Sequence, residues 1–158
     1  MSGNHKVLVV GAGAQGNVVA GVLSRADDIG ALVLADLDPD RARETAANIG
    51  SDKVRVDRVD AGDLDRTTAF LRSGRFDLVV NTALPEFIPK VLLAALQAGT
   101  NYLDLSSALF YERRGKPIEQ LEHEEEWKAS GRTALVNAGS APGLTNVMAR
   151  EGADDLDD

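Results

Sequence analysis

Three glycines near the start of the chain, Gly11, Gly13 and Gly16, have the spacing of a loop that binds a diphosphate. Gly11 allows a tight exit from the preceding apolar run, and Gly13 lets backbone approach a pyrophosphate because no Cβ stands in the way. Gly16 lets the following helix pack closely on that run, and the free N–H groups at the start of the helix favour an anion. The pattern predicts a dinucleotide-binding turn.

An acidic residue, Asp36, stands at the end of the second apolar run, twenty residues after Gly16. This position strengthens the prediction, because a carboxylate there can accept both hydroxyl hydrogen bonds of an adenosine ribose and repels a 2′-phosphate. The sequence therefore favours NAD. Arg41 and Arg43 lie in the first turns of the next helix and could accommodate that phosphate, which keeps NADP as the alternative.

Further polar segments follow the later apolar runs, at the edge where an open α/β sheet places its ligand crevice. Residues 59–61 could flank the adenine, residues 81–85 could run along the cofactor, and residues 138–143 could face the nicotinamide. Asp60 and the serines after the fifth run are also typical turn formers. The candidate cofactor contacts are Gly11, Gly13, Ala14, Gln15, Gly16, Asp36, Asp60, Ala61, Asn81, Thr82 and Ala83. The candidates on the substrate side are Ser106, Ala138, Gly139, Pro142 and Gly143.

A repeated unit must position these residues: a short β-branched or Leu-rich run, then a loop, then a segment of helical spacing. The apolar runs occupy residues 6–10, 31–35, 54–59, 77–81, 101–105 and 133–137. Strands this apolar need cover on both faces, as in a parallel sheet. Six repeats predict an α/β fold of the Rossmann type, a doubly wound parallel sheet of six strands in three layers with strand order 3-2-1-4-5-6.

Helix ends are marked in the sequence as well. Asp38 before Pro39 is an N-cap followed by proline at the first helical position, and this helix is expected to stop at Gly50. Asp63 can cap the next helix, which is expected to end near residues 73–74. Another helix is expected over about residues 87–98, with Gly99 at its end.

Composition limits the function classes. The chain of 158 residues fits one domain, and no apolar run is long enough to span a bilayer, so we expect no membrane protein. Cysteine is absent, which excludes disulfides and thiolate metal sites within this sequence. The formal net charge of −8 argues against a nucleic-acid partner. The start of the chain does not resemble a signal peptide, so we expect a cytoplasmic protein.

Other catalytic patterns do not fit. Neither tyrosine is followed by lysine four residues later, so the acid–base pair of short-chain dehydrogenases is missing. His123 has no second histidine four residues on, which indicates a solvated helix face, and we predict no metal site. Ser140 lies one place too early for the Gly-x-Ser-x-Gly pattern of hydrolases.

Several segments together resemble the N-terminal domain of saccharopine dehydrogenase-like proteins, a group that includes saccharopine reductase, lysine dehydrogenase and carboxynorspermidine dehydrogenase. The segments are the glycine-rich turn, ADLDPDRA from Ala35, NTALP from Asn81, AGTNYLDLS from Ala98 and SAPGLTN from Ser140. The resemblance covers about residues 6–150, and AGTNYLDLS followed by APGLTN is its most diagnostic part.

The resemblance implies an NAD(P)-dependent oxidoreductase that passes hydride between nicotinamide and the C–N bond of an amino acid or amine. It also implies a second domain after the APG turn, which supplies much of the substrate pocket and often mediates dimerisation. We therefore expect residues 1–150 to form the dinucleotide-binding domain, and the full-length form to be a homodimer. Residues 151–158 are expected to be a solvated, frayed acidic tail that begins the second domain. This chain stops at Asp158, either as a fragment or as a natural short version, so we expect cofactor binding without catalysis by this chain alone.

Two other interpretations stay open at this point. The length also fits a stand-alone module that senses NAD(H) and reports its redox state to a partner, although such a module needs no substrate-side turn. The other interpretation is a scaffold protein that binds no cofactor, which predicts no change in melting temperature with saturating NAD.

Overall fold

A single parallel sheet organises the chain in the computed structural model, which describes residues 4–107, 118–154 and 156. Its strands run in the order β3-β2-β1-β4-β5-β6, so the predicted order is confirmed. The strand bounds are β1 His5–Val10, β2 Ile29–Asp36, β3 Val54–Arg58, β4 Leu78–Asn81, β5 Asn101–Asp104 and β6 Ala134–Leu135. The order reverses between β1 and β4, where a doubly wound sheet opens its crevice.

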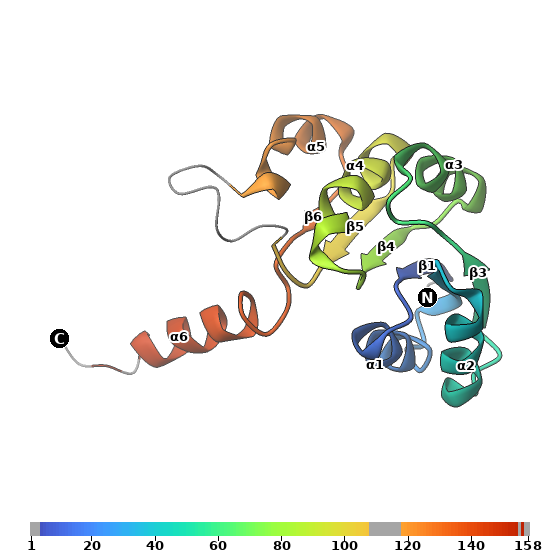
Figure 1. Cartoon of the computed structure of the whole chain (residues 1–158). Coiled ribbons are helices and arrows are strands. Elements are labelled where there is room, and N and C mark those ends of the chain that lie inside the picture. The colour runs from blue at the N-terminus through green and yellow to red at the C-terminus, as the bar shows by residue number, and fades with distance from the viewer. Residues whose placement is uncertain (1–3, 108–117, 155, 157–158) are drawn as a thin grey trace.

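Helices cover both faces of the sheet, which gives the predicted three layers. Figure 1 shows α1 and α2 on one side of the sheet and α3, α4 and α5 on the other, while α6 projects away from it. The α-helices are α1 Ala14–Leu23, α2 Pro39–Ile49, α3 Leu64–Gly74, α4 Ile88–Ala98, α5 Glu124–Ser130 and α6 Leu144–Asp154. Two short 3₁₀ helices are η1 Pro85–Phe87 and η2 Glu119–Leu121.

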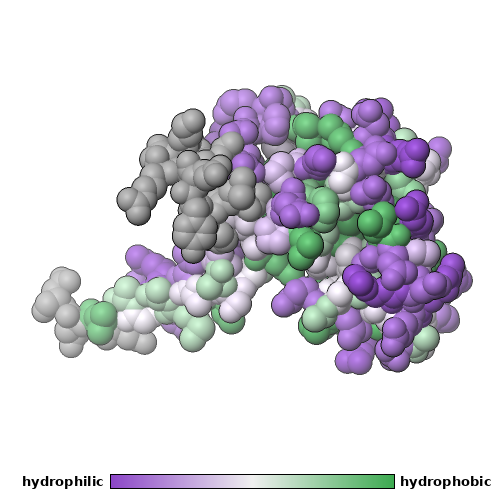
Figure 2. Space-filling view, in the orientation of Figure 1, coloured by the Kyte–Doolittle hydropathy of each residue, from purple (hydrophilic) through white to green (hydrophobic). Residues whose placement is uncertain are grey.

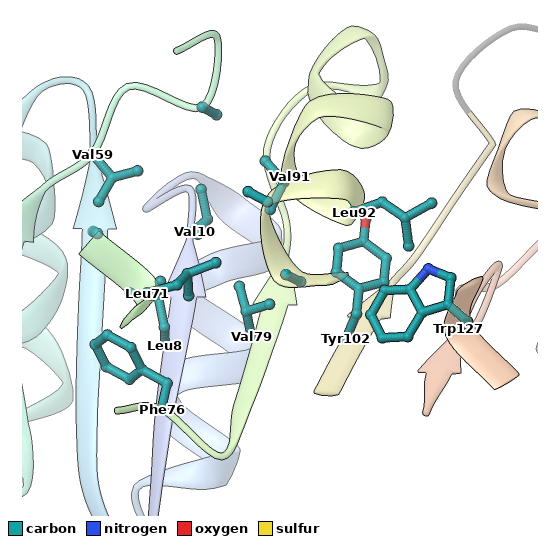
Figure 3. Close-up of a cluster of buried hydrophobic side chains, with 14 residues drawn as sticks. Leu8, Val10, Val59, Leu71, Phe76, Val79, Val91, Leu92, Tyr102 and Trp127 are labelled. Atoms are coloured by element: carbon teal, nitrogen blue, oxygen red, sulfur yellow. The ribbon is translucent and has the colours of Figure 1, made fainter. Parts of the chain in front are cut away.

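The side chains of β1 alternate between two apolar cores, as the twofold period of a strand requires. Leu8 and Val10 join the core under α3 and α4, in which Leu71, Val79 and Val91 are also buried (Figure 3). The next side chains along β1 point to the opposite face, under α1 and α2. There the buried residues are Val7, Val9, Ala12, Ala20, Ile29, Leu32, Leu34, Ala42, Val54 and Val80.

The predicted helix caps are present. The Asp38 carboxylate accepts from the N–H of Asp40 at 3.0 Å, and α2 ends at Gly50 with a φ of 66°. Asp63 caps α3 through the N–H of Arg66, also at 3.0 Å, and Gly99 ends α4. These ends fix where the strand-to-helix loops begin, and those loops form the site.

The chain differs from the prediction at its C-terminal part. The predicted strand over residues 133–137 is only two residues long, because Asn137 adopts a left-handed φ of 60° and donates its N–H to the Asp104 carboxylate. Residues 151–154 are exposed as expected, yet they continue α6 instead of fraying, with an Arg150–Asp154 ion pair at 2.8 Å.

In the described part of the chain, no helix combines the length and apolar character that crossing a bilayer needs.

Candidate functional site

The glycine-rich turn has the geometry that its motif predicts. Gly11 leaves β1 with a φ of +100°, and a Cβ on it would lie 2.9 Å from the Ala83 nitrogen. A Cβ on Gly16 would overlap the carbonyl oxygen of Gly11, so this glycine lets α1 approach the turn. A Cβ on Gly13 would meet no protein atom within 4 Å. The space beside Gly13 is therefore open at the N-terminus of α1, where the first N–H groups of a helix lack intrahelical acceptors.

Two threonines hold this turn in place, and the sequence did not single them out for this role. The hydroxyl of Thr82 lies 2.9 Å from the Val10 oxygen and 2.8 Å from the Gly11 oxygen. From the other side, the buried hydroxyl of Thr45 in α2 donates to the Ala12 oxygen at 3.1 Å. Thr82, a predicted cofactor contact, also lines both cavities.

Asp36 ends β2 directly beside the turn. One of its carboxylate oxygens accepts from the Ala12 N–H at 2.7 Å, and the other accepts from the Asp38 N–H at 3.0 Å. These two amides fix the orientation of the carboxylate. Each oxygen still has a free lone pair, since a carboxylate oxygen can accept two hydrogen bonds.

A first cavity of about 370 Å³ opens next to Asp36. Arg41 lies in its wall, whereas Arg43 forms an ion pair with Asp40 and lies outside it. Asp60 also lines the cavity, but its carboxylate accepts from the Gly62 N–H at 2.9 Å, so it is a turn former as well. The lining residues are Val10, Gly11, Gly13, Asp36, Leu37, Arg41, Val59, Asp60, Ala61, Thr82, Ala83, Leu84 and Phe87.

Part of the apolar wall of the first cavity, formed by Leu37 and Phe87, was missed by the sequence analysis, whereas Leu84 lies in the predicted segment 81–85. Leu37 and Leu84 are 53% and 64% exposed, and Phe87 stands at the end of η1. The only sequence signal is their position, one to six residues after a strand end. Such side chains can pack on the two faces of a flat aromatic ligand.

A second cavity, of about 380 Å³, lies on the other side of the β4 loop. It brings together candidates from both predicted groups. The lining residues are Gln15, Asn81, Thr82, Ala83, Leu84, Pro85, Leu105, Ser106, Gly139 and Ser140. Among the residues that the structure describes, none of those lining this cavity is charged. The two cavities share Thr82, Ala83 and Leu84, so they form one crevice across the β1–β4 switch point.

Five predicted site residues line neither cavity. Ala14 is exposed at the start of α1, and Gly16 is a packing residue. Ala138 donates its N–H to the Asp104 oxygen, while Pro142 and Gly143 shape the turn that leads into α6. In the described ranges, no three His, Asp or Glu side chains come together as a metal site.

A buried polar cluster lies behind the second cavity. Asp104 is fully buried, and burial raises its pKa above the usual value, while hydrogen bonds from the Asn137 amide and the Gln120 side chain act in the opposite direction. The pKa of Tyr102 is raised well above its usual value, first by burial and then by the charge of Asp104. Tyr102 also packs against Trp127 of α5, with ring centroids 6.5 Å apart (Figure 3).

Relatives with known names match most of this chain. It is 34% identical over 149 residues to carboxyaminopropylagmatine dehydrogenase from Synechocystis sp., which covers 90% of this chain and 36% of that protein. It is 26% identical over 158 residues to carboxynorspermidine synthase from Vibrio cholerae, covering 90% and 38% respectively. The chain thus spans little more than a third of the length of these curated relatives.

Solved structures share the fold. Saccharopine dehydrogenase (L-Glu forming) from Saccharomyces cerevisiae superposes with a TM-score of 0.79 at 23% identity, over 97% of this chain and 31% of that one. GenD2 from gentamicin A biosynthesis, in complex with NAD, superposes with a TM-score of 0.66 at 20% identity, over 87% of this chain and 35% of that one.

Residues 7–135 match the family described as the saccharopine dehydrogenase NADP binding domain. This match spans well over half of the chain and agrees with the fold and with the glycine-rich turn. The chain therefore belongs to the saccharopine dehydrogenase NADP-binding-domain family.

Proposed function

We propose that this chain binds a nicotinamide dinucleotide across both cavities, as the cofactor-binding part of an oxidoreductase that acts on the C–N bond of an amine or amino acid. The carrying observation is the open space beside Gly13 at the N-terminus of α1, with a cavity on each side of the β4 loop. The diphosphate lies at the helix N-terminus, the adenosine in the first cavity and the nicotinamide in the second.

The nature of the substrate is proposed from the relatives. Both curated relatives are named for carboxy-substituted amines, one as a dehydrogenase and one as a synthase. The second cavity offers neutral polar groups, such as the Gln15 amide and the Ser106 hydroxyl, beside apolar ones. None of its described lining residues is an acid or a base, so we assign them contacts with the ligands and no proton transfer.

A second domain is part of this proposal. In its support, α6 has no buried residue and carries the exposed apolar side chains Leu144, Val147 and Met148, which are 58–65% exposed. Figure 2 shows apolar colours recurring along α6, while hydrophilic side chains dominate the outer helices of the body. We propose that this helix packs against the substrate-binding domain of a longer, cytoplasmic, homodimeric protein.

The residues of the first cavity bear on the choice between NAD and NADP. The Asp36 carboxylate favours NAD because it repels a 2′-phosphate, whereas Arg41 in the same cavity and the family description favour NADP. We propose NAD as the preferred cofactor, with NADP as the weaker ligand. A stand-alone NAD(H) sensor would bind the same cofactor, but it needs no substrate-side turn such as the one that brings Gly139 and Ser140 to the second cavity.

The test is a calorimetric titration of the purified chain with NADH and, separately, with NADPH. We expect one site per chain and a lower Kd for NADH. A lower Kd for NADPH would contradict the role given to Asp36. No heat with either ligand, together with an unchanged melting temperature, would contradict dinucleotide binding altogether.

A further inference from the structure

One buried carboxylate connects the loops that line the second cavity. Asp104 is the last residue of β5 and is fully buried, so it does not touch a ligand in either cavity. Burying a carboxylate costs several kcal/mol unless hydrogen bonds compensate, by the typical desolvation of an ion. The groups around Asp104 connect it, directly or through one intermediate side chain, to three loops that line the second cavity.

The first connection is to the loop after β6. The Asp104 carboxylate accepts from the Asn137 N–H at 2.7 Å, and the Asp104 backbone oxygen accepts from the Ala138 N–H at 2.9 Å. Asn137 is held in its left-handed conformation, and its side-chain oxygen accepts from the Ser107 hydroxyl at 2.8 Å. Directly after these anchored residues come Gly139 and Ser140, which line the cavity.

The second connection is to the loop after β5, through η2. The Gln120 amide nitrogen donates to the other Asp104 oxygen at 3.2 Å and to the Ser106 backbone oxygen at 2.9 Å. Gln120 is 3% exposed and lines neither cavity. Gln120 therefore links the backbone of Ser106, a cavity residue, to the Asp104 carboxylate.

The third connection is to the loop after β4, through Tyr102. Its hydroxyl neighbours Asp104 and accepts from the Asn81 amide nitrogen at 3.2 Å. The Asn81 amide oxygen in turn accepts from the Ala83 N–H at 3.1 Å. Asn81 and Ala83 both line the second cavity, so the chain of contacts runs from the cofactor side of the crevice to its far wall.

We propose that Asp104 is a positioning residue. It holds the three loops around the second cavity in position relative to one another, and thereby shapes the binding site of the nicotinamide. The proposal rests on the proposed function, since it assigns the second cavity to the nicotinamide. A carboxylate suits this position because it offers only acceptors, whereas all of its hydrogen-bonding partners present donors. Asparagine would place an NH₂ group against one of these donors.

The test compares two ligands on the purified chain. ADP-ribose fills the adenosine and diphosphate positions only, whereas NADH adds the dihydronicotinamide. For Asp104→Asn we expect the Kd of ADP-ribose to stay within about twofold and the Kd of NADH to rise about fivefold to tenfold, the usual net contribution of one hydrogen bond. The fluorescence emission of bound NADH, which reports the surroundings of its ring, is expected to shift as well.

Two further variants keep the test clean. Tyr102→Phe removes only the oxygen that links Asp104 to Asn81, at a residue that lines neither cavity, and we expect the same selective loss of NADH affinity. Asp77→Asn is the control, at a half-exposed carboxylate. Asp77 also accepts a backbone N–H, from Lys6 at 2.8 Å, but it lies just before the amino-terminal end of β4, away from the carboxyl ends of the strands where both cavities open, so we expect no change for either ligand.

The outcomes separate this inference from the proposed function. If the unmodified chain binds neither ligand, the proposed function fails. If it binds NADH no better than ADP-ribose, if Asp104→Asn and Tyr102→Phe weaken both ligands equally, or if they weaken neither, the positioning role of Asp104 is overturned while dinucleotide binding stands.

Discussion

At the scale of single residues, the three glycines of the first turn have three different structural roles. Gly11 supplies a left-handed backbone, Gly16 supplies close packing, and Gly13 leaves open space. The motif spacing predicted this division, because each role follows from the missing Cβ. The contacts of Thr45, Asp104 and Gln120 could not be predicted, because they join segments that only the folded chain brings together.

The Gly13 and Gly16 positions give a matched pair of variants. Gly13→Ala places its Cβ in open space, so we expect a nearly unchanged melting temperature and a loss of NADH affinity of about tenfold or more, because the methyl group occupies the diphosphate position. Gly16→Ala places its Cβ on the Gly11 oxygen, so we expect destabilisation of about 3 kcal/mol, the upper end of overpacking effects. Thermal unfolding and NADH titration of both variants are the measurements. Equal stability of the two variants would contradict the packing role of Gly16.

We propose that Asp36 determines the preference between NAD and NADP. Asp36→Asn keeps one acceptor oxygen, for the amide of either Ala12 or Asp38, and removes the charge that repels a 2′-phosphate. We expect the ratio of the NADPH Kd to the NADH Kd to fall about tenfold, a change of about 1.4 kcal/mol. Asp40→Asn is the control, since this exposed carboxylate in the first turn of α2 lines neither cavity. An unchanged ratio of the two Kd values in Asp36→Asn would contradict the role of Asp36 in the preference for NAD.

At the scale of elements, helix ends were predicted best, because the residues that mark them act on the backbone next to them. Asp38, Asp63, Gly50 and Gly99 mark helix ends by local chemistry, and each stands where it was predicted. The end of β6 was predicted two residues too late, because a tertiary hydrogen bond to Asp104 turns the chain at Asn137. The extent of α6 was missed because its acidic end resembles a solvated tail in the sequence.

The cap of α3 can be tested against a neighbouring carboxylate. Asp63→Ala removes the hydrogen bond to the Arg66 N–H, so we expect a loss of about 1 kcal/mol in the free energy of unfolding. Asp65→Ala removes an exposed acid from the same first turn without removing a cap, so we expect a clearly smaller loss. Urea unfolding of the two variants measures the difference. Equal losses would show that charge at the helix start, and not the cap, carries the effect.

At the scale of the whole molecule, the strand order was predictable because six apolar runs, each followed by a helix, admit few arrangements under right-handed crossovers. That order places the crevice at the switch between β1 and β4, and both cavities lie there. The wall residues Leu37 and Phe87 could not be predicted, because loop side chains carry no periodic signal.

The central claim is that a dinucleotide rests its diphosphate on the N-terminus of α1, and amide NMR of the ¹⁵N-labelled chain tests it residue by residue. Saturation with NADH is predicted to shift the amide signals of Gly13, Ala14 and Gln15 most, with further shifts at Ala83 and Ser106, and to leave those of α5 unchanged. Signals that stay in place at Gly13, Ala14 and Gln15 while NADH is bound, or no shift anywhere at saturating NADH and NADPH, would contradict the claim.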